Sequence, residues 1–304
     1  MILKENDYMN MKELLFIVNP VSGKKMILKE MGAVLSVFNK SGFLPKVYYT
    51  QKRGDATIAA SEYGIDHDLI CCAGGDGTLN EVVSGVLKTN SSAEIAYIPC
   101  GSTNDFALSR GLSSNPVQEA ERIVSASNLH EYDVGQFDDR YFTYTAAFGA
   151  FSHVSYATDQ NLKNIFGHTA YLMSGIKDLS NIKPVHATVM ANGIEYEDDF
   201  LFGAVSNSTS VGGTVSLPGN LVDTSDGKFE VILIRMPKSI INLNDIVLSL
   251  ISQKYDSEYI RFFQADNLTV KTVQPYAWTL DGEASAENTE VHIRVIHKAL
   301  RLRG

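Results

Sequence analysis

Over residues 1–133, the chain alternates between short apolar runs and segments whose apolar residues recur at every third or fourth position. The first pattern predicts buried strands and the second predicts helices. The predicted elements are strand Leu14–Val18, helix 27–38, strand Val47–Tyr49, helix 55–63, strand Asp68–Ala73, helix 79–87 and strand Ile95–Ile98. Such a βαβα succession predicts an α/β domain, in which a parallel sheet carries helices on its faces.

A further helix is predicted to start after this succession. Asn115 can cap it, and Pro116 suits its first turn. Gln118 stands at the third helical position, where its side-chain amide can reach back toward the cap.

The pattern changes after Asp133, where we place the boundary between a domain of residues 1–133 and one of residues 134–304. Alternation in Tyr141–Phe151 predicts one strand, and Asn192-Gly193 predicts a hairpin turn. The remaining predicted elements are strands Phe229–Ile234, Tyr259–Gln264, Leu268–Val273 and Val291–Ile296, and helices near 166–180 and 237–253. The second domain is therefore predicted to be a mainly β sandwich, and we expect the C-terminal tail to pack back on the first domain.

The composition excludes several classes of protein. Apolar residues make up 44% of the 304 residues and charged ones 20%, which is typical of a globular protein. The formal net charge of −9 disfavours nucleic acid as a partner, because that partner requires a basic surface. Cys71, Cys72 and Cys100 have the spacing of neither a zinc site nor a disulfide framework. There is no secretory signal and no apolar run of about 18 residues, so we expect a cytoplasmic protein.

The most informative loop is Ala73-Gly74-Gly75-Asp76-Gly77-Thr78, which joins a predicted strand to a predicted helix. Its glycines allow a ligand to approach the backbone, and the helix start attracts phosphate. Asp76 would repel a bare phosphate but suits one that is bound through Mg²⁺. The loop has neither the GxGxxG nor the Walker pattern. We interpret it as a phosphate site, and the alternative is a plain glycine-rich turn.

Two other loops of small polar residues follow predicted strands. They are Asn19-Pro20-Val21-Ser22-Gly23-Lys24 and Pro99-Cys100-Gly101-Ser102-Thr103-Asn104-Asp105-Phe106. Ligands of parallel sheets bind beyond the carboxyl ends of the strands, so all three loops should meet at one edge. Each loop alone could be an ordinary turn, but together they predict a nucleotide site.

Two acidic segments stand out in the second domain. In Leu280-Asp281-Gly282-Glu283, a carboxylate beside a glycine is sterically open, which makes Asp281 a candidate general base. The segment Asp223-Thr224-Ser225-Asp226-Gly227-Lys228 could coordinate a hard cation through a carboxylate and backbone carbonyls. Either segment could instead be a simple Asp-Gly turn.

The order NPVSG, GGDGT, PCGSTNDFA, DGKFEV and LDGE resembles the diacylglycerol kinase catalytic-domain family, which includes bacterial lipid kinases and the sphingosine and ceramide kinases. The resemblance covers nearly the whole chain. NAD kinases and phosphofructokinases also carry versions of GGDGT, whereas GSTNDFA with LDGE separates the lipid kinases from them. The resemblance to the lipid kinases implies a phosphofructokinase/NAD-kinase-like nucleotide-binding domain and a lipid-substrate domain. It also implies transfer of the ATP γ-phosphoryl group, with Mg²⁺, to a lipid alcohol, and our first choice is diacylglycerol, which gives phosphatidic acid.

The resemblance further implies which residues form the site. Contacts with ATP and its Mg²⁺ are expected from Asn19, Ser22, Gly23, Thr50, Gly74, Gly75, Asp76, Gly77, Thr78, Asn80, Glu81, Ser102, Thr103, Asn104 and Asp105. A structural Mg²⁺ would be held by Asp226 with the carbonyls of Asp223 and Lys228, and linked through water to Asp76 and Asp105. Asp281 or Glu283 would accept the proton of the substrate hydroxyl, and we favour Asp281.

Some alternatives stay open. Many family members have an arginine directly after NDFA, whereas this chain has Leu108 there and Arg110 two positions later. If that arginine helps to hold the phosphates or the lipid headgroup, its absence argues against diacylglycerol as the substrate but not against a lipid kinase. The rival hypotheses are a soluble NAD kinase and a nucleotide-binding protein without turnover. Transient contact with the inner face of the membrane is expected, and the apolar segment 165–176 could make that contact or pack in the core. A homodimer is also compatible with the sequence.

Overall fold

A computed structural model of the chain describes residues 11–23, 25–89, 91–149, 183–211, 215–217, 219–255 and 257–304. The predicted helix near 166–180 and the apolar segment 165–176 lie outside these residues. The chain divides into two compact units. Unit 1 consists of Met1–Tyr132 with Lys298–Gly304, and unit 2 of Asp133–His297.

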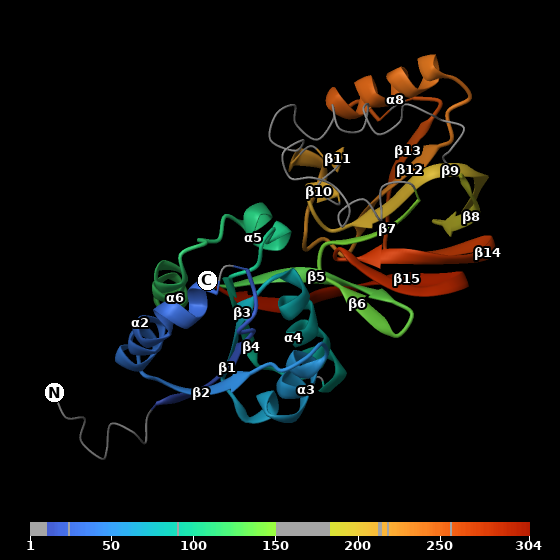
Figure 1. The fold of residues 1–304 in the computed structure, drawn as a ribbon. Coiled ribbons are helices and arrows are strands. Elements are labelled where there is room, and N and C mark those ends of the chain that lie inside the picture. Colours follow the sequence, from blue (N-terminus) through green and yellow to red (C-terminus); the bar gives the residue numbers. More distant parts are fainter. Residues whose placement is uncertain are drawn as a thin grey trace. The chain divides into compact units, whose positions relative to one another are not determined.

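Unit 1 contains a parallel sheet with helices on both faces (Figure 1). Its strands lie in the order β2-β1-β3-β4, and each neighbouring pair is parallel. Its elements are β1 (Lys12–Val18), α2 (Met26–Lys40), β2 (Phe43–Tyr49), α3 (Asp55–Glu62), the 3₁₀ turn η1 (Gly64–Asp66), β3 (Leu69–Gly74), α4 (Asp76–Thr89), β4 (Glu94–Pro99), α5 (Asp105–Arg110) and α6 (Pro116–Ser125).

Burial on both faces explains why these strands are continuous apolar runs. In β1, Leu14, Phe16 and Val18 pack in the core that α2 and α6 cover. Leu15 and Ile17 are buried on the opposite face, where α3 and α4 lie (Figure 1). A parallel sheet that is covered on both sides has no polar face, so the strand sequence does not alternate.

The helix starts predicted from the sequence agree with the structure to different degrees. Asn115 caps α6 as predicted, because its side chain accepts the N–H groups of Val117 and Gln118 at 3.0 and 3.1 Å. The Gln118 side chain accepts a hydrogen bond from the Ser113 hydroxyl instead of returning to the cap. The start of α4 was predicted three residues too late, since the helix begins at Asp76.

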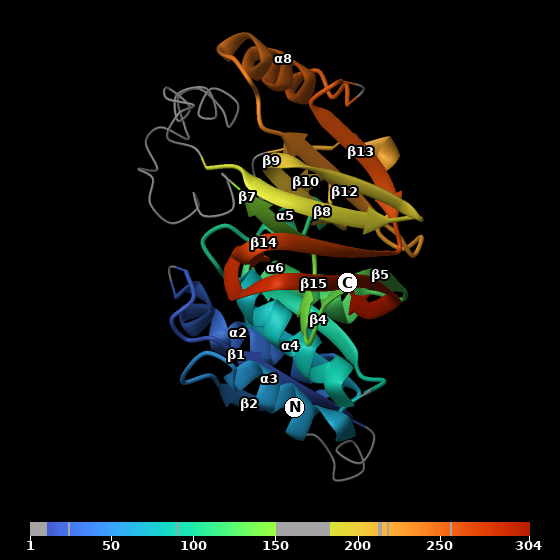
Figure 2. The same ribbon diagram turned by 90° about the vertical axis from the view of Figure 1, so that its right-hand side faces the viewer.

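Unit 2 is built mainly from antiparallel strands (Figure 2). Its elements are β6 (Arg140–Phe142), β7 (Thr145–Gly149), β8 (Val185–Ala191), β9 (Ile194–Ser206), β10 (Ser210–Val211), β11 (Val215–Ser216), the 3₁₀ turn η4 (Gly219–Leu221), β12 (Phe229–Arg235), α8 (Ile240–Ile251), β13 (Ile260–Ala265) and β14 (Asn267–Leu280). Strands β5 (Leu129–Phe137) and β15 (Glu283–Arg303) contribute residues to both units. Asn192 and Gly193 form the predicted hairpin turn between β8 and β9, and both have positive φ.

Two long strands change partners along their length. The first half of β9 pairs with β8, and its second half pairs with β7 and β12. The first half of β14 likewise pairs with β8, and its end pairs with β7. The core of unit 2 includes Phe148, Phe229 and Trp278. A second apolar cluster on these strands is covered by Ile246 and Leu250 of α8.

The prediction of one strand over Tyr141–Phe151 is wrong. The structure has two strands, β6 and β7, with Thr143 and Tyr144 between them. The N–H groups of both residues donate to the carboxylate of Asp281 instead of to a neighbouring strand, and this interrupts the ladder. The last residues of the predicted segment lie outside the described part of the chain.

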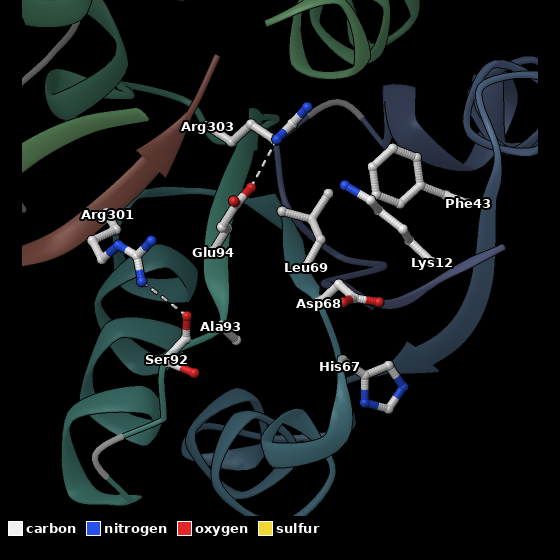
Figure 3. A pocket seen from close by; sticks show the side chains of 10 residues that line it. All are labelled: Lys12, Phe43, His67, Asp68, Leu69, Ser92, Ala93, Glu94, Arg301 and Arg303. Atoms are coloured by element: carbon white, nitrogen blue, oxygen red, sulfur yellow. Dashed lines mark hydrogen bonds and ion pairs between the residues drawn. The ribbon is translucent and has the colours of Figure 1, made fainter. Parts of the chain in front are cut away.

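The C-terminal residues 298–304 belong to unit 1. Leu302 is buried and pairs in parallel with Ile95 of β4. The Arg303 guanidinium donates to the Glu94 carboxylate at 2.9 Å (Figure 3). It also donates to the carbonyls of Ile123 and Ala126. A cavity of about 270 Å³ lies beside Arg303, at the amino-terminal ends of β1–β4. The last strand therefore completes the sheet of unit 1.

Replacing Leu302 with alanine should lower the free energy of unfolding by about 2–5 kcal/mol, because the truncation leaves a cavity where the tail packs. Ile65→Ala, at an exposed aliphatic position of the same unit, should change it by less than about 0.5 kcal/mol. Urea unfolding followed by circular dichroism measures both. Equal effects of the two substitutions would show that the tail does not stabilise unit 1.

Candidate active site

The predicted site residues fall into two groups, one in each unit. The group in unit 1 comprises the loops that follow β1, β3 and β4, together with Thr50 directly after β2 and the starts of α4 and α5. The group in unit 2 comprises the turn at residues 223–228 and the turn between β14 and β15.

The three loops of unit 1 touch one another through glycines. A Cβ atom on Gly23, which has φ +50°, would lie 2.2 Å from the Cys100 carbonyl oxygen. A Cβ on Gly101 would lie 2.6 Å from the Cα of Gly75. Any larger side chain at Gly23 or Gly101 would push the loops apart, so these glycines are required for their packing. The loops that the sequence placed at one edge are therefore in contact.

Side chains link the same loops. Asn19 Nδ2 donates to Thr78 Oγ1 at 3.2 Å, which joins the first loop to the start of α4. Asn104 has the left-handed backbone conformation, and its side-chain amide bonds to both the N–H and the carbonyl of Gly101. The Tyr97 hydroxyl lies 3.3 Å from the Gly74 carbonyl oxygen and 3.4 Å from Asn104 Oδ1, and its one proton is shared between these two acceptors. Burial, with the Asp76 charge as a smaller cause, raises the pKa of Tyr97, which keeps this hydroxyl a donor.

Asp76 connects the glycine-rich loop to α5. Its carboxylate accepts the N–H groups of Asp105 and Phe106 at 2.8 and 3.3 Å. Asp76 and Asp105, both predicted to lie near Mg²⁺ and phosphate, therefore occupy neighbouring positions. Each Asp76 oxygen accepts one of these bonds.

The Glu81 and Thr50 side chains have structural partners. The Glu81 carboxylate accepts the N–H groups of Gly54 and Ala56, at the start of α3, at 2.8 and 3.1 Å. The Thr50 N–H and hydroxyl both donate to the Val18 carbonyl. These bonds fix the position of the loop between β2 and α3. Asn80 accepts from the Ser84 hydroxyl at 3.5 Å, within α4.

The hydroxyls of Ser102 and Thr103 are exposed on the third loop. The Gly75 N–H donates no hydrogen bond to any residue that the structure describes. An unused backbone donor beside exposed hydroxyls suits the oxygens of a phosphate or a sugar.

Leu108, which directly follows NDFA, and Arg110 lie in different environments. Leu108 is one of the most exposed apolar side chains of the chain. The Arg110 guanidinium lies over the rings of Tyr132 and Phe106, at 4.4 and 5.3 Å from their centroids. Burial lowers the pKa of Arg110. Arg110 therefore packs on two aromatic rings, whereas position 108 carries an exposed aliphatic side chain.

In unit 2, Asp281 is buried and accepts four hydrogen bonds. Its donors are the N–H groups of Thr143, Tyr144 and Thr145, at 2.6, 3.0 and 3.0 Å, and the Thr143 hydroxyl at 2.9 Å. Four donors match the four acceptor directions of a carboxylate. Asp281 is therefore a structural anchor, while Glu283, the first residue of β15, is partly exposed.

The turn at residues 223–228 presents two carboxylates. Asp223 Oδ1 accepts from the N–H and hydroxyl of Ser225, and Asp226 Oδ1 accepts from the Lys228 N–H at 2.9 Å. Within the described residues, the Oδ2 atoms of both carboxylates accept no hydrogen bond. No group of three or more His, Cys, Asp or Glu side chains in that part of the chain is arranged so that these side chains alone could hold a metal ion. The carboxylate oxygens and carbonyls of the turn are the hard ligands that Mg²⁺ prefers, so the residues fit this ion.

Sequence reasoning missed the residues that hold this turn in place. Asp133 is fully buried, and its carboxylate accepts from the Gly227 N–H at 2.7 Å and contacts His297 Nδ1 at 3.0 Å. Asn207 is also buried and donates to the carbonyls of Asp133 and Thr224. These partners are far apart in the sequence, and no local pattern marks them.

Glu230 is buried close to the same turn. Burial raises its pKa to about 7, and the charges of Asp226 and Asp223 add to the rise. One of its oxygens accepts from Gln264 Nε2 at 3.1 Å, and the other is buried without a partner among the described residues. Three carboxylates near one turn would repel one another less if a cation were bound there.

Comparisons with known proteins identify relatives of both units. Residues 13–137 match the diacylglycerol kinase catalytic domain, and residues 145–303 match the YegS C-terminal NAD kinase beta sandwich-like domain. A diacylglycerol kinase of Staphylococcus aureus (strain JH9) is 30% identical over 296 residues, with 93% of this chain and 92% of that protein covered. One of Bacillus subtilis (strain 168) is 29% identical over 274 residues, with 90% of each chain covered.

A crystal structure of a diacylglycerol kinase from Bacillus anthracis str. Sterne has the same fold. Its TM-score is 0.74 at 22% sequence identity, with 96% of each chain covered. Together, the two matched domains and the relatives of similar length account for both units. The chain therefore belongs to the diacylglycerol kinase family, whose members are lipid kinases.

Proposed function

We propose that the protein transfers the γ-phosphoryl group of ATP to the hydroxyl of a membrane lipid, with diacylglycerol as the first candidate and phosphatidic acid as its product. The observation that carries this proposal is the contact of the three strand-end loops around Asp76 in a chain of this family. Phosphoryl transfer depends mainly on alignment and charge neutralisation, so a rigid set of loops is the main requirement.

The loops of unit 1 are proposed to bind the nucleotide. The Gly75 N–H and the hydroxyls of Ser22, Ser102 and Thr103 would contact the phosphates and the sugar. Support comes from the exposure of the Ser102 and Thr103 hydroxyls and from the unused Gly75 N–H within the described residues. The other predicted residues of this group would act by holding the loops together, as Asn19 and Asn104 do through their hydrogen bonds.

Mg²⁺ is proposed to act at two places. Asp76 would hold the ion that accompanies ATP, and Asp226 with the carbonyls of Asp223 and Lys228 would hold a structural ion. When bound, Mg²⁺ would neutralise phosphate and carboxylate charge. The open Oδ2 atoms of the 223–228 turn and the crowding around Glu230 support the second site.

Glu283 is proposed as the general base, in place of our first choice, Asp281. The Asp281 carboxylate already has four donors, and taking a proton would require it to give up at least one of them. Glu283 lies two residues later and is partly exposed. Asp281 then has a positioning role, because it fixes the turn from which Glu283 extends.

The lipid site is defined less closely than the nucleotide site. Since Leu108 replaces the arginine that many family members carry, the lipid headgroup would have one cation fewer at this position. No helix among the described residues is long and apolar enough to cross a membrane. We propose that the enzyme works at the inner membrane face through transient contact.

The direct test is transfer of label from γ-labelled ATP to micellar diacylglycerol, to a total lipid extract and to NAD, in separate reactions with Mg²⁺. Label in an organic-extractable product identifies a lipid kinase, and chromatography identifies its substrate. Label in NADP alone would replace the proposal with an NAD kinase. Nucleotide binding without transfer to any acceptor would contradict both.

The two acids of the LDGE segment should have different roles in a variant comparison. Glu283→Gln should lower kcat by about 10²–10⁴-fold without changing the thermal unfolding midpoint, because a positioned proton acceptor is lost. Asp281→Asn should lower the unfolding midpoint, because its amide nitrogen meets backbone N–H groups that need an acceptor. If Asp281→Asn lost turnover at an unchanged midpoint and Glu283→Gln remained active, Asp281 would be the base.

Mg²⁺ without nucleotide should raise the thermal unfolding midpoint of the wild-type protein, because an ion that binds only the folded state stabilises it. Asp226→Asn should remove most of this increase, whereas Asp139→Asn, at an exposed position of unit 2, should retain it. An equal increase in all three proteins would contradict a structural ion at Asp226.

A further inference from the structure

Helix α8 has three different faces. At about 100° per residue, Leu243, Ile246, Val247 and Leu250 fall within an arc of about 100°. This first face is buried, and its residues include two that cover the second apolar cluster of unit 2. Asn242, Asp245 and Ser249 form a polar second face.

The third face is apolar and exposed. Ile240, Ile241, Leu248 and Ile251 are 69%, 72%, 62% and 55% exposed, and they share an arc of about 100° with Asn244. No other helix in the described part of the chain has more than two exposed large apolar side chains. A single exposed leucine is ordinary, but four aliphatic side chains on one helix face mark a surface that contacts another apolar phase.

The charges around this face favour an anionic lipid surface. Lys238 precedes α8 and Lys254 follows it, both are exposed, and neither forms an ion pair with a described residue. The one acid of the helix, Asp245, lies on the polar face. Aliphatic side chains between two lysines match a bilayer, where apolar groups enter the acyl boundary and ammonium groups stay among the headgroups.

We propose that the exposed face of α8, formed by Ile240, Ile241, Leu248 and Ile251, is the surface through which the protein docks on an anionic membrane. The choice of a membrane as the partner rests on the proposed function, because a kinase of membrane lipids must reach a bilayer that holds its substrate. It assigns to unit 2 a membrane-binding element that is separate from the LDGE and 223–228 turns.

The test uses the full chain and two double variants that are matched in charge. Ile241→Asp with Leu248→Asp places two carboxylates on the proposed surface. Ile194→Asp with Val273→Asp places two at exposed aliphatic positions of β9 and β14. All four sites are exposed, so both variants should fold, which thermal unfolding verifies. Co-sedimentation with phosphatidylcholine–phosphatidylglycerol vesicles measures binding without ATP.

The α8 variant should bind these vesicles at least about tenfold more weakly than the wild type, and the control variant should bind as the wild type does. Pure phosphatidylcholine vesicles should bind the wild type more weakly. The α8 variant should also lose turnover on vesicle-bound diacylglycerol but keep it on a monomeric short-chain diacylglycerol. Wild-type binding by the α8 variant, or no vesicle binding by the wild type, would overturn the docking surface.

The assay separates this inference from the proposed kinase reaction. If the α8 variant binds vesicles more weakly but the protein phosphorylates no lipid, the docking surface is retained and the proposed reaction is rejected. A change of oligomeric state in the α8 variant, measured by light scattering, with unchanged vesicle binding would make this face a contact between two copies of the chain and reject membrane docking.

Discussion

The path of the chain through unit 2 depends on one buried carboxylate. Asp281 collects three consecutive backbone N–H groups and a hydroxyl from Thr143–Thr145, a segment 136–138 positions earlier in the chain. A buried anion is stable only when such donors surround it, so removing any of them is costly. The same interaction ends β6, starts β7 and fixes the turn before Glu283. The hydrogen bonds of Asp281 therefore determine where Glu283, the proposed general base, lies.

In unit 1, the arrangement of the strand-end loops depends on close contact between their backbones. Gly23, Gly75 and Gly101 allow the loops after β1, β3 and β4 to meet, and side-chain bonds from Asn19 and Asn104 hold them. The glycines of a phosphate loop are commonly attributed to the ligand alone. Here the loops already need them in order to touch one another, and such a rigid arrangement would lower the conformational entropy lost if the proposed nucleotide binds.

The features that the sequence predicted well depend on local physics. Asn192-Gly193 and Asn115 act through backbone conformations and hydrogen bonds within a few residues. What could not be predicted depends on partners distant in the sequence. The break between β6 and β7 exists because of Asp281, and the fixed position of the 223–228 turn depends on Asp133, 94 positions before Gly227. Periodicity and turn propensity contain no information about such pairs.

The division of unit 1 between the two ends of the chain affects how the protein is made. Residues 298–304 supply the strand beside β4, and all of unit 2 is translated between them and Tyr132. On the ribosome, unit 1 must therefore wait with one edge of its sheet open, although it is synthesised first. An open edge can pair with other chains, so the β4 edge of the nascent protein is exposed to aggregation until residues 298–304 have been synthesised.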